Sequence, residues 1–280
     1  MTQNDSAKTI RNALAVRFGE NISIDENLPG LDELARIASR HVTRRYLARE
    51  IDPALLRLLC ACALSAPTKS DLQQADIIIV KDTDKRRVIA DLIPDQPFIR
   101  TAPAFLIFLA NGRRLPEISK LRGKPFPNDH LDLFFNASVD AALALATFTR
   151  AAEAAGLGCC PISVIRDHAA RITDLLALPP RVIPVAGMCV GWPAEAGHIS
   201  PRLPLECTLH QDRYDEGDLA GRIDAYDRRR AAIHPHRPRD PARWGTAQFY
   251  GWSEDKARQY GVPQRADFGA FVRAKGFCLD

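Results

Sequence analysis

Arginine and histidine side chains crowd residues 40–46, where the sequence reads RHVTRRY. The stretch LDELARIASRHV (31–42) has apolar residues at helical spacing, so this basic segment is predicted to lie at a helix end. Cations at a helix C-terminus complement the helix dipole and need no ligand. The same side chains could also bind a phosphate or an anionic ring, because the planar guanidinium of arginine donates paired hydrogen bonds to such groups. The rest of the chain decides between these interpretations.

A second group of polar side chains fills residues 68–74, with the sequence TKSDLQQ. It lies between a predicted helix and the β-branched run IIIV at 77–80, which is typical of a strand. Asp52 and Pro53 are typical of the start of that helix, and Pro67 ends it. The loop can form hydrogen bonds with a ligand, although an ordinary connecting loop would use similar residues.

Three longer regions are predicted to form the core of the fold. AFLIFLA (104–110) and RVIPVAGMCVGW (181–192) are typical of buried strands. Residues 130–158 contain a long helix that is apolar on nearly every face, with Gly156 as its expected C-cap. Neighbours in one chain seldom cover every face of a helix, so we expect this one at the interface of a homodimer. Shorter elements are expected as a helix from about residue 84, an extended segment over 159–164, a helix over 166–176 and a proline-stiffened arm over 200–206.

The composition is that of a soluble globular protein, with 280 residues of which 46% are hydrophobic and 26% charged. The chain begins without an apolar leader and has no uninterrupted apolar run of about 20 residues, so we expect a cytoplasmic protein without membrane contact. The seven cysteines sit mostly in apolar runs and lack zinc-ligand spacing, which predicts reduced thiols and no metal. The net charge is only +4 and the arginines form scattered clusters, which favours a nucleotide over a nucleic acid as the ligand.

Several common catalytic motifs do not occur in the sequence. It has neither the GxGxxG of a dinucleotide-binding fold, nor a P-loop, nor the GxSxG of a hydrolase. What remains is a set of anion-binding and hydrogen-bonding groups without a clear acid, base or nucleophile. That pattern is typical of a protein whose cofactor carries the chemistry.

Five motifs agree in order and spacing with those of a known family. They are the basic segment 40–46, the loop 68–73, Gln96, Gly156-Leu157-Gly158, and the strand PVAGMCVGW followed by PRLP. Together they resemble the FMN-dependent nitroreductase family, most closely its NADPH nitroreductase and flavin reductase branch. The resemblance covers about residues 31–226.

This resemblance implies an α+β fold of three layers, in which helices flank a central mixed, mostly antiparallel sheet. It also implies a homodimer with an FMN at each subunit boundary. Residues 1–30 are then an N-terminal extension and residues 31–225 are the FMN-binding domain. Residues 226–280 are an arginine- and aromatic-rich tail that packs on the domain or on the partner subunit.

The resemblance also implies roles for single residues. Arg44 is expected at the N1 and O2 edge of the isoalloxazine, where its charge stabilises the anionic reduced flavin. Arg237 and Arg239 are the nearest matches to a tail arginine that binds the 2′-phosphate of NADPH, and a solvated basic tail is the simple alternative. The expected FMN-binding positions are Arg40, His41, Val42, Arg44, Thr68, Ser70, Gln96, Pro161, Ile162, Ser163, Val164 and Arg202.

Some positions depart from the family pattern. Val42 stands where a serine is common, and Ser200 stands where a second phosphate-binding lysine is common. Pro161 and Ser163-Val164 replace an aromatic residue and a Gly-Gly pair, which is expected to narrow the space beside the flavin and to alter the choice of substrate. The nearest candidates to supply the missing cation are Arg45, Lys69 and the tail.

The implied function is an FMN-dependent oxidoreductase with ping-pong kinetics. It would take a hydride from NADPH or NADH and pass reducing equivalents to a nitroaromatic, a quinone or a free flavin. Two alternatives stay open at this point. One is a flavin enzyme of the same fold with another reaction, such as dehalogenation or enone reduction, and the other is a noncatalytic flavin- or nucleotide-binding protein whose tail binds a partner or RNA.

Overall fold

The computed structural model describes residues 3–280, and its residues form two compact units. One unit contains residues 42–197 and 265–280, and the other contains residues 1–41 and 198–264. The strands are β1 (Ala75–Ile79), β2 (Ala104–Asn111), β3 (Gly158–Ile162) and β4 (Val182–Gly191). The α-helices are α1 (Gln3–Phe18), α2 (Leu31–Ser39), α3 (Pro53–Leu64), α4 (Thr83–Leu92), α5 (Phe98–Thr101), α6 (Arg114–Leu121), α7 (Leu131–Ala154), α8 (Ala169–Leu175), α9 (Leu219–Ile233), α10 (Pro241–Trp244), α11 (Trp252–Tyr260) and α12 (Phe268–Ala274). Short 3-10 turns lie at η1 (Lys69–Asp71), η2 (Val164–His168) and η3 (Leu205–Cys207).

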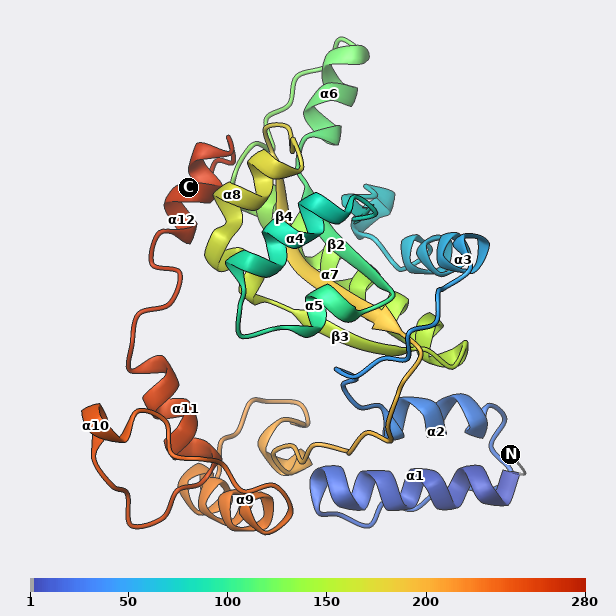
Figure 1. The fold of residues 1–280 in the computed structure, drawn as a ribbon, viewed down its shortest axis with the longest axis vertical. Coiled ribbons are helices and arrows are strands. Elements are labelled where there is room, and N and C mark those ends of the chain that lie inside the picture. The colour runs from blue at the N-terminus through green and yellow to red at the C-terminus, as the bar shows by residue number, and fades with distance from the viewer. Residues whose placement is uncertain (1–2) are drawn as a thin grey trace. The chain divides into compact units, whose positions relative to one another are not determined.

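The larger unit is built on a four-stranded sheet in the order β1-β2-β4-β3. Strands β2, β3 and β4 are labelled in Figure 1. Every pairing between neighbouring strands is antiparallel. All eight residues of β2 are buried, and nearly all of β4 is buried too, which confirms the two strands predicted from their apolar runs. The extended segment predicted after Gly158 is β3, which forms one edge of the sheet.

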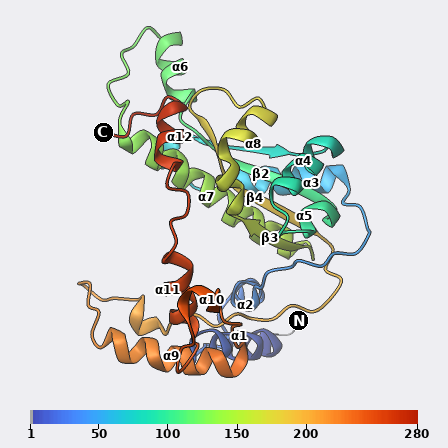
Figure 2. The same ribbon diagram turned by 60° about the vertical axis from the view of Figure 1, so that its left-hand side comes forward.

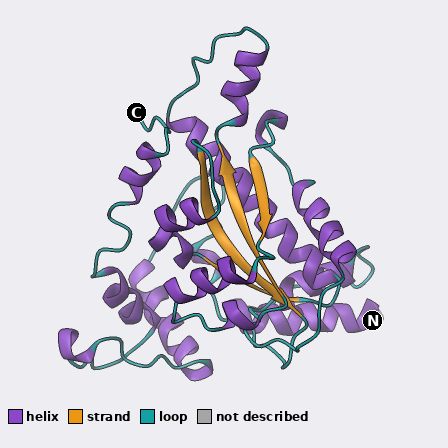
Figure 3. Cartoon of the chain, turned by 45° about the horizontal axis from the view of Figure 1, so that its top comes forward, coloured by secondary structure: helices purple, strands orange, loops and turns teal. Residues whose placement is uncertain are grey.

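Helices cover both faces of this sheet, as Figure 3 shows. Alternate residues of the central strands enter two different apolar clusters: Phe105 packs with residues of α4, α5 and α8, whereas Phe108 packs with residues of α3 and α7. This alternation follows from the two-residue period of a strand. The α+β fold with a sheet between two helix layers is therefore confirmed.

Helix α7 runs along the sheet and ends at a glycine as predicted. Gly156 has φ +80°, the Leu157 amide donates to the Ala152 carbonyl (2.9 Å) and the Gly156 amide donates to the Glu153 carbonyl (3.1 Å), which together form a Schellman motif. By length and composition α7 is also the one helix in the described chain that could cross a membrane. In the structure it packs on α3 and the sheet.

One face of α7 is exposed within a single chain. Neighbours in the chain therefore do not cover every face of this apolar helix, as the sequence led us to expect. The exposed side chains are spaced four residues apart and lie on one stripe. They are Leu131, Phe135, Val139 and Leu143, with exposed fractions of 49%, 61%, 39% and 37%.

The smaller unit contains the N-terminal helices and much of the C-terminal region. Helices α1 and α2 bury an apolar cluster of Ala7, Ile10, Ala13, Leu31, Ala35 and Ala38. Helix α11 packs on α9 (Figure 2), where the rings of Tyr226 and Trp252 meet edge to face at 5.3 Å between centroids.

The last residues return to the larger unit. Val272 of α12 and Phe277 pack with Ala137 and Ala141 of α7, and the Phe277 ring lies against Gly112. The domain boundaries predicted after residues 30 and 225 stay a prediction. All seven cysteines are free thiols.

Candidate functional site

The basic segment follows helix α2 but does not belong to it. The helix ends at Ser39, three residues earlier than its apolar pattern predicted, and Arg40 has the extended-type angles φ −52° and ψ 136°. From Thr43 onward the chain runs beside the ends of β3 and β4. The Thr43 amide donates to the Cys159 carbonyl (3.0 Å), and the Leu47 amide donates to the Trp192 carbonyl (2.9 Å). The cations are therefore displayed on an extended segment fixed to the sheet, so the simple interpretation as a helix end is wrong for residues 43–46.

Tyr46 holds residues 43–46 in place through its side-chain hydroxyl. Its hydroxyl donates to the Thr43 carbonyl (2.6 Å) and lies 3.3 Å from the Cys189 carbonyl, while burial raises the pKa of the phenol far above its usual range. Thr43 itself lies against Gly158, where an added Cβ would come within 2.2 Å of the threonine Oγ1. Glycine at this position lets the segment approach β3 closely.

Arg44 is exposed. Its guanidinium carbon lies 6.0 Å from the centroid of the Phe98 ring, and no carboxylate within residues 3–280 pairs with it. Gln96 lies two residues before Phe98 and is half-buried. An unpaired cation beside an aromatic ring is suited to an anionic planar ligand.

The end of β3 belongs to the same face of the sheet. Phe98 and Ile162 share one apolar cluster, and Val164 packs against it. Pro161 and Ser163 are exposed, whereas Ile162 is 3% exposed, so only the backbone of Ile162 can take part in binding. The structure thus gathers Arg44, Gln96 and the end of β3 on the face covered by α4, α5 and α8.

The loop of residues 68–74 is held by a buried carboxylate on α7. Asp140, 2% exposed, accepts hydrogen bonds from the Lys69 amide (3.2 Å) and from the Gln74 amide (3.0 Å). Thr68 Oγ1 accepts a further bond from the Gln73 amide (3.2 Å). Asp140 is recognisable in the sequence as an acidic residue inside an apolar helix, but its role as an anchor of the loop was not predicted.

This loop carries unusual backbone strain. Ser70, Asp71 and Gln73 all have positive φ values, of 49°, 58° and 53°. Non-glycine residues rarely adopt this conformation, and such strain clusters at functional sites. Helix α7 therefore holds the loop in one backbone conformation, which by itself is unfavourable in free energy.

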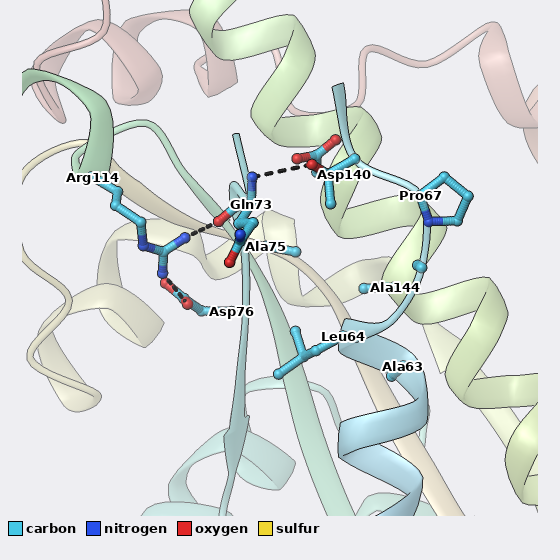
Figure 4. A pocket seen from close by; sticks show the side chains of 11 residues that line it. Ala63, Leu64, Pro67, Gln73, Ala75, Asp76, Arg114, Asp140 and Ala144 are labelled. Atoms are coloured by element: carbon cyan, nitrogen blue, oxygen red, sulfur yellow. Dashed lines mark hydrogen bonds and ion pairs between the residues drawn. The ribbon is translucent and has the colours of Figure 1, made fainter. Parts of the chain in front are cut away.

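A cavity of about 250 Å³ opens beside the loop (Figure 4). Thr68 and Gln73 line it from the loop, Asp76 lines it from β1 and Arg114 lines it from the start of α6. The Arg114 guanidinium pairs with the Asp76 carboxylate (2.6 Å) and donates to the Gln73 carbonyl. Gln73 and Arg114 are thus polar lining residues that the sequence analysis missed.

Within one chain the two groups of predicted site residues are not brought together. Thr68 and Ser70 are anchored on α7, which covers one face of the sheet. Arg44 lies over Phe98, which packs on the opposite face. The sheet itself separates them.

The predicted FMN-binding residues Arg40, His41 and Arg202 belong to the smaller unit, where Arg17 of α1 bonds to this region. The Arg17 guanidinium donates to the carbonyls of Arg40 (2.6 Å) and Ser200 (3.4 Å), and its own carbonyl accepts from the Arg202 amide (2.6 Å). Arg40 and the 200–206 arm are therefore tied to the same helix end. Arg17 lies in the region predicted as an extension, and nothing in its local sequence indicated this role.

The two tail arginines differ in their surroundings. The Arg239 guanidinium lies 3.4 Å from the buried Asp255 carboxylate, whose pKa is held down by its bonds to Lys256 and Tyr250 against the opposing effect of burial. Arg237 is exposed. The other cations considered as replacements are also paired, Arg45 with Glu195 (3.3 Å) and Lys69 with Asp132 (3.3 Å).

Comparisons with known proteins identify relatives of this chain. The chain is 34% identical over 189 residues to the FMN reductase [NAD(P)H] of Bacillus subtilis, covering 66% of this chain and 75% of that protein. It is 26% identical to the NADPH-flavin oxidoreductase of Vibrio harveyi, covering 86% and 95% of the two chains. The solved structure of Bacillus megaterium NfrA2 superposes with a TM-score of 0.80 at 30% identity, over 89% of this chain and 99% of that one.

Family models cover most of the chain. The model of the nitroreductase family matches residues 37–192, and the model of the nitroreductase family C-terminal domain matches residues 200–280. The first match alone contains both the basic segment and the strained loop, and the second contains Arg202 and the tail. The chain belongs to the nitroreductase family.

Proposed function

We propose that this protein is an FMN-dependent NAD(P)H oxidoreductase that reduces nitroaromatics, quinones or flavins. The observation that carries the proposal is the exposed, unpaired Arg44, fixed by Tyr46 and the sheet beside Phe98 in a chain of the nitroreductase family. A fixed cation stabilises the negative charge that develops on a reduced isoalloxazine. The similarity to an FMN reductase and to an NADPH-flavin oxidoreductase supports the same cofactor and reductant here.

The residues present fit an FMN. Arg44 and Gln96 offer a cation and an amide for the ring, and the end of β3 offers backbone groups at Pro161, Ile162, Ser163 and Val164. Hydroxyl groups come from Thr68 and Ser70. We assign the ribityl and phosphate end to Arg40, His41, Val42 and Arg202, and Arg202 is an exposed residue. The bound flavin would supply the hydride chemistry, and the protein would bind it, orient it and stabilise its charge.

The separation of the two groups by the sheet supports a site shared between two subunits. In one chain Thr68 and Ser70 lie on the α7 side, next to the exposed stripe of Leu131, Phe135, Val139 and Leu143. Burying that stripe in a homodimer would carry the 68–74 loop to the subunit interface. We therefore propose a homodimer in which each FMN lies between Arg44 of one subunit and the 68–74 loop of the other.

Arg237 is the better candidate for the 2′-phosphate of NADPH. Arg239 already pairs with the buried Asp255, so binding a phosphate would compete with that ion pair. Arg237 is exposed, and no carboxylate in the described part of the chain forms an ion pair with it. We further propose a cytoplasmic enzyme that acts on small molecules rather than on nucleic acid or a membrane.

Spectroscopy of the purified protein tests the function. We expect a yellow protein, or one that binds added FMN, whose flavin absorbance bleaches when NADPH or NADH is added and returns when a quinone or nitroaromatic follows. The Arg237→Ala variant should lose the preference for NADPH over NADH, while Arg228→Ala, an exposed arginine of α9, serves as the matched control. A protein that binds no FMN contradicts the proposal, and one that binds FMN without bleaching contradicts the assigned reductant.

A further inference from the structure

Residues 200–202 belong to no helix or strand, but hydrogen bonds from distant parts of the chain hold them. In chain order, their three carbonyls accept from the side chains of Arg17 (3.4 Å), Tyr226 (3.1 Å) and Arg229 (2.6 Å). The Arg202 amide donates to the Arg17 carbonyl (2.6 Å). Because these bonds satisfy the backbone from both sides, the segment has one defined conformation outside any helix or sheet.

Arg17 lies in the last turn of α1 and joins this segment to another part of the site. Its guanidinium also donates to the carbonyls of Ala38 (3.0 Å) and Arg40 (2.6 Å). A planar guanidinium has five N–H donors in a fixed geometry and can therefore hold several carbonyls at once. The ammonium group of a lysine does not reproduce this geometry.

Arg229 reaches the same place from α9. Its guanidinium donates to the carbonyls of Val16 (3.0 Å) and Arg202 (2.6 Å), so it links the last turn of α1 to the 200–206 arm. Its positive charge also complements the dipole at the C-terminal end of α1. Two arginines from different helices therefore hold the backbone around Arg202.

Arg202 is the side chain that this segment carries. It is exposed, and no carboxylate within residues 3–280 forms an ion pair with it. A cavity of about 620 Å³ lies beside it, and among the described residues its lining includes three arginines and no acidic side chain; the arginines are Arg17, Arg202 and Arg230. Cations lining a cavity without an acidic neighbour favour an anionic ligand.

We propose that Arg17 and Arg229 are positioning residues of the flavin site, which hold Arg202 in place for the phosphate of FMN. A cation on a fixed backbone loses less conformational entropy when it binds an anion, so it binds more tightly. Helix α1 thereby becomes part of the flavin site, although it lies outside the ranges 37–192 and 200–280 that the family models match. This role rests on the proposed function and makes the site selective for FMN over riboflavin, which has the same ring without the phosphate.

The affinities for FMN and riboflavin test this role. The full-length protein is stripped of flavin, and the Kd of each flavin is measured by the quenching of its fluorescence. We expect Arg17→Ala to lower the preference for FMN over riboflavin about tenfold or more, as the loss of a positioned bond to a charged group does. Lys8→Ala removes the same charge from an exposed position of α1 and should leave the preference unchanged. An unchanged preference in Arg17→Ala overturns the proposal.

Arg17→Lys separates position from charge. The lysine keeps the positive charge and loses the planar set of donors, so this variant should also lose most of the preference for FMN. A lysine variant with the full preference would show that charge alone is sufficient, and the positioning role would be wrong.

A double-mutant cycle tests whether Arg17 acts through Arg202. Once Arg202→Ala has removed the cation itself, adding Arg17→Ala should lower the preference for FMN by a much smaller factor than it does in the original protein. Equal factors in the two backgrounds would contradict the proposal.

Arg229→Ala provides a second variant if Arg17→Ala does not fold. It should also lower the preference for FMN about tenfold or more, because it releases the Arg202 carbonyl. Arg228→Ala, at the exposed neighbouring arginine, is its matched control. An unchanged preference in Arg229→Ala would overturn its positioning role.

The two affinities also separate positioning from folding. A variant that loses affinity for FMN and riboflavin by the same factor has lost structure only, which would overturn the proposal. A protein that binds FMN and is bleached by NADPH, but whose Arg17 and Arg229 variants keep the preference for FMN, contradicts the positioning role alone. An unaltered protein that binds neither flavin contradicts the proposed oxidoreductase as well.

Discussion

A single carboxylate, Asp140, holds the strained loop in place. It accepts two backbone hydrogen bonds from residues five positions apart, while three neighbouring residues remain in left-handed conformations. That conformation costs free energy, so the loop keeps its shape only while the anchor compensates. The sequence could not show this, because positive φ is usually indicated by glycine and residues 68–74 contain none.

Replacing Asp140 with Asn should release the loop. The amide keeps one acceptor oxygen in place of two, so one of the bonds to Lys69 and Gln74 is lost. We expect the free energy of unfolding to fall by about 1–3 kcal/mol. Denaturant titration measures this cost, and hydrogen exchange should show faster exchange at the amides of Lys69 and Gln74. Asp224→Asn, at an exposed aspartate of α9, is the control, and unchanged exchange at the two loop amides would contradict the assigned role.

At the scale of elements, the sequence predicted what depends on local pattern. Asp52 caps the start of helix α3 just before Pro53, and Gly156 follows the end of α7. Both could be predicted because a helix cap depends on residues that are adjacent in the sequence. Strands β2 and β4 followed from continuous apolar runs. The course of residues 43–47 could not be predicted, since it depends on contacts with residues more than a hundred positions away.

The contact between that segment and β3 can be tested at Gly158. A Cβ there would overlap Thr43, so Gly158→Ala should push the segment off the strand and destabilise the fold by about 1–3 kcal/mol. Removing the opposing side chain in a Gly158→Ala, Thr43→Gly double variant should recover part of that loss. Unfolding free energies of the two single variants and the double variant give the coupling energy. Strictly additive losses would show that the two residues do not touch.

At the scale of the whole molecule, the proposed homodimer would bring together the predicted site residues that the sheet separates within one chain. The sequence indicated the residues but not their division between the two faces of one sheet, because that division depends on the three-dimensional order of the layers. Membership of the nitroreductase family accounts for the fold of one chain. The exposed apolar stripe on α7 is the observation that supports a second chain.

Phe135 is the most exposed side chain of that stripe, at 61%. Phe135→Glu would place a charge in an apolar interface and should convert the proposed dimer to a monomer, because an unpaired buried charge costs several kcal/mol. If each FMN lies between subunits, the same variant should lose its flavin in parallel. Light scattering after gel filtration reports the mass, and the flavin absorbance of the same peak reports FMN per chain. Leu121→Glu, at a 74% exposed leucine of α6, should leave both unchanged. A monomeric Phe135→Glu variant that retains FMN would place the whole flavin site within one subunit, and a variant that remains dimeric would place the interface away from α7.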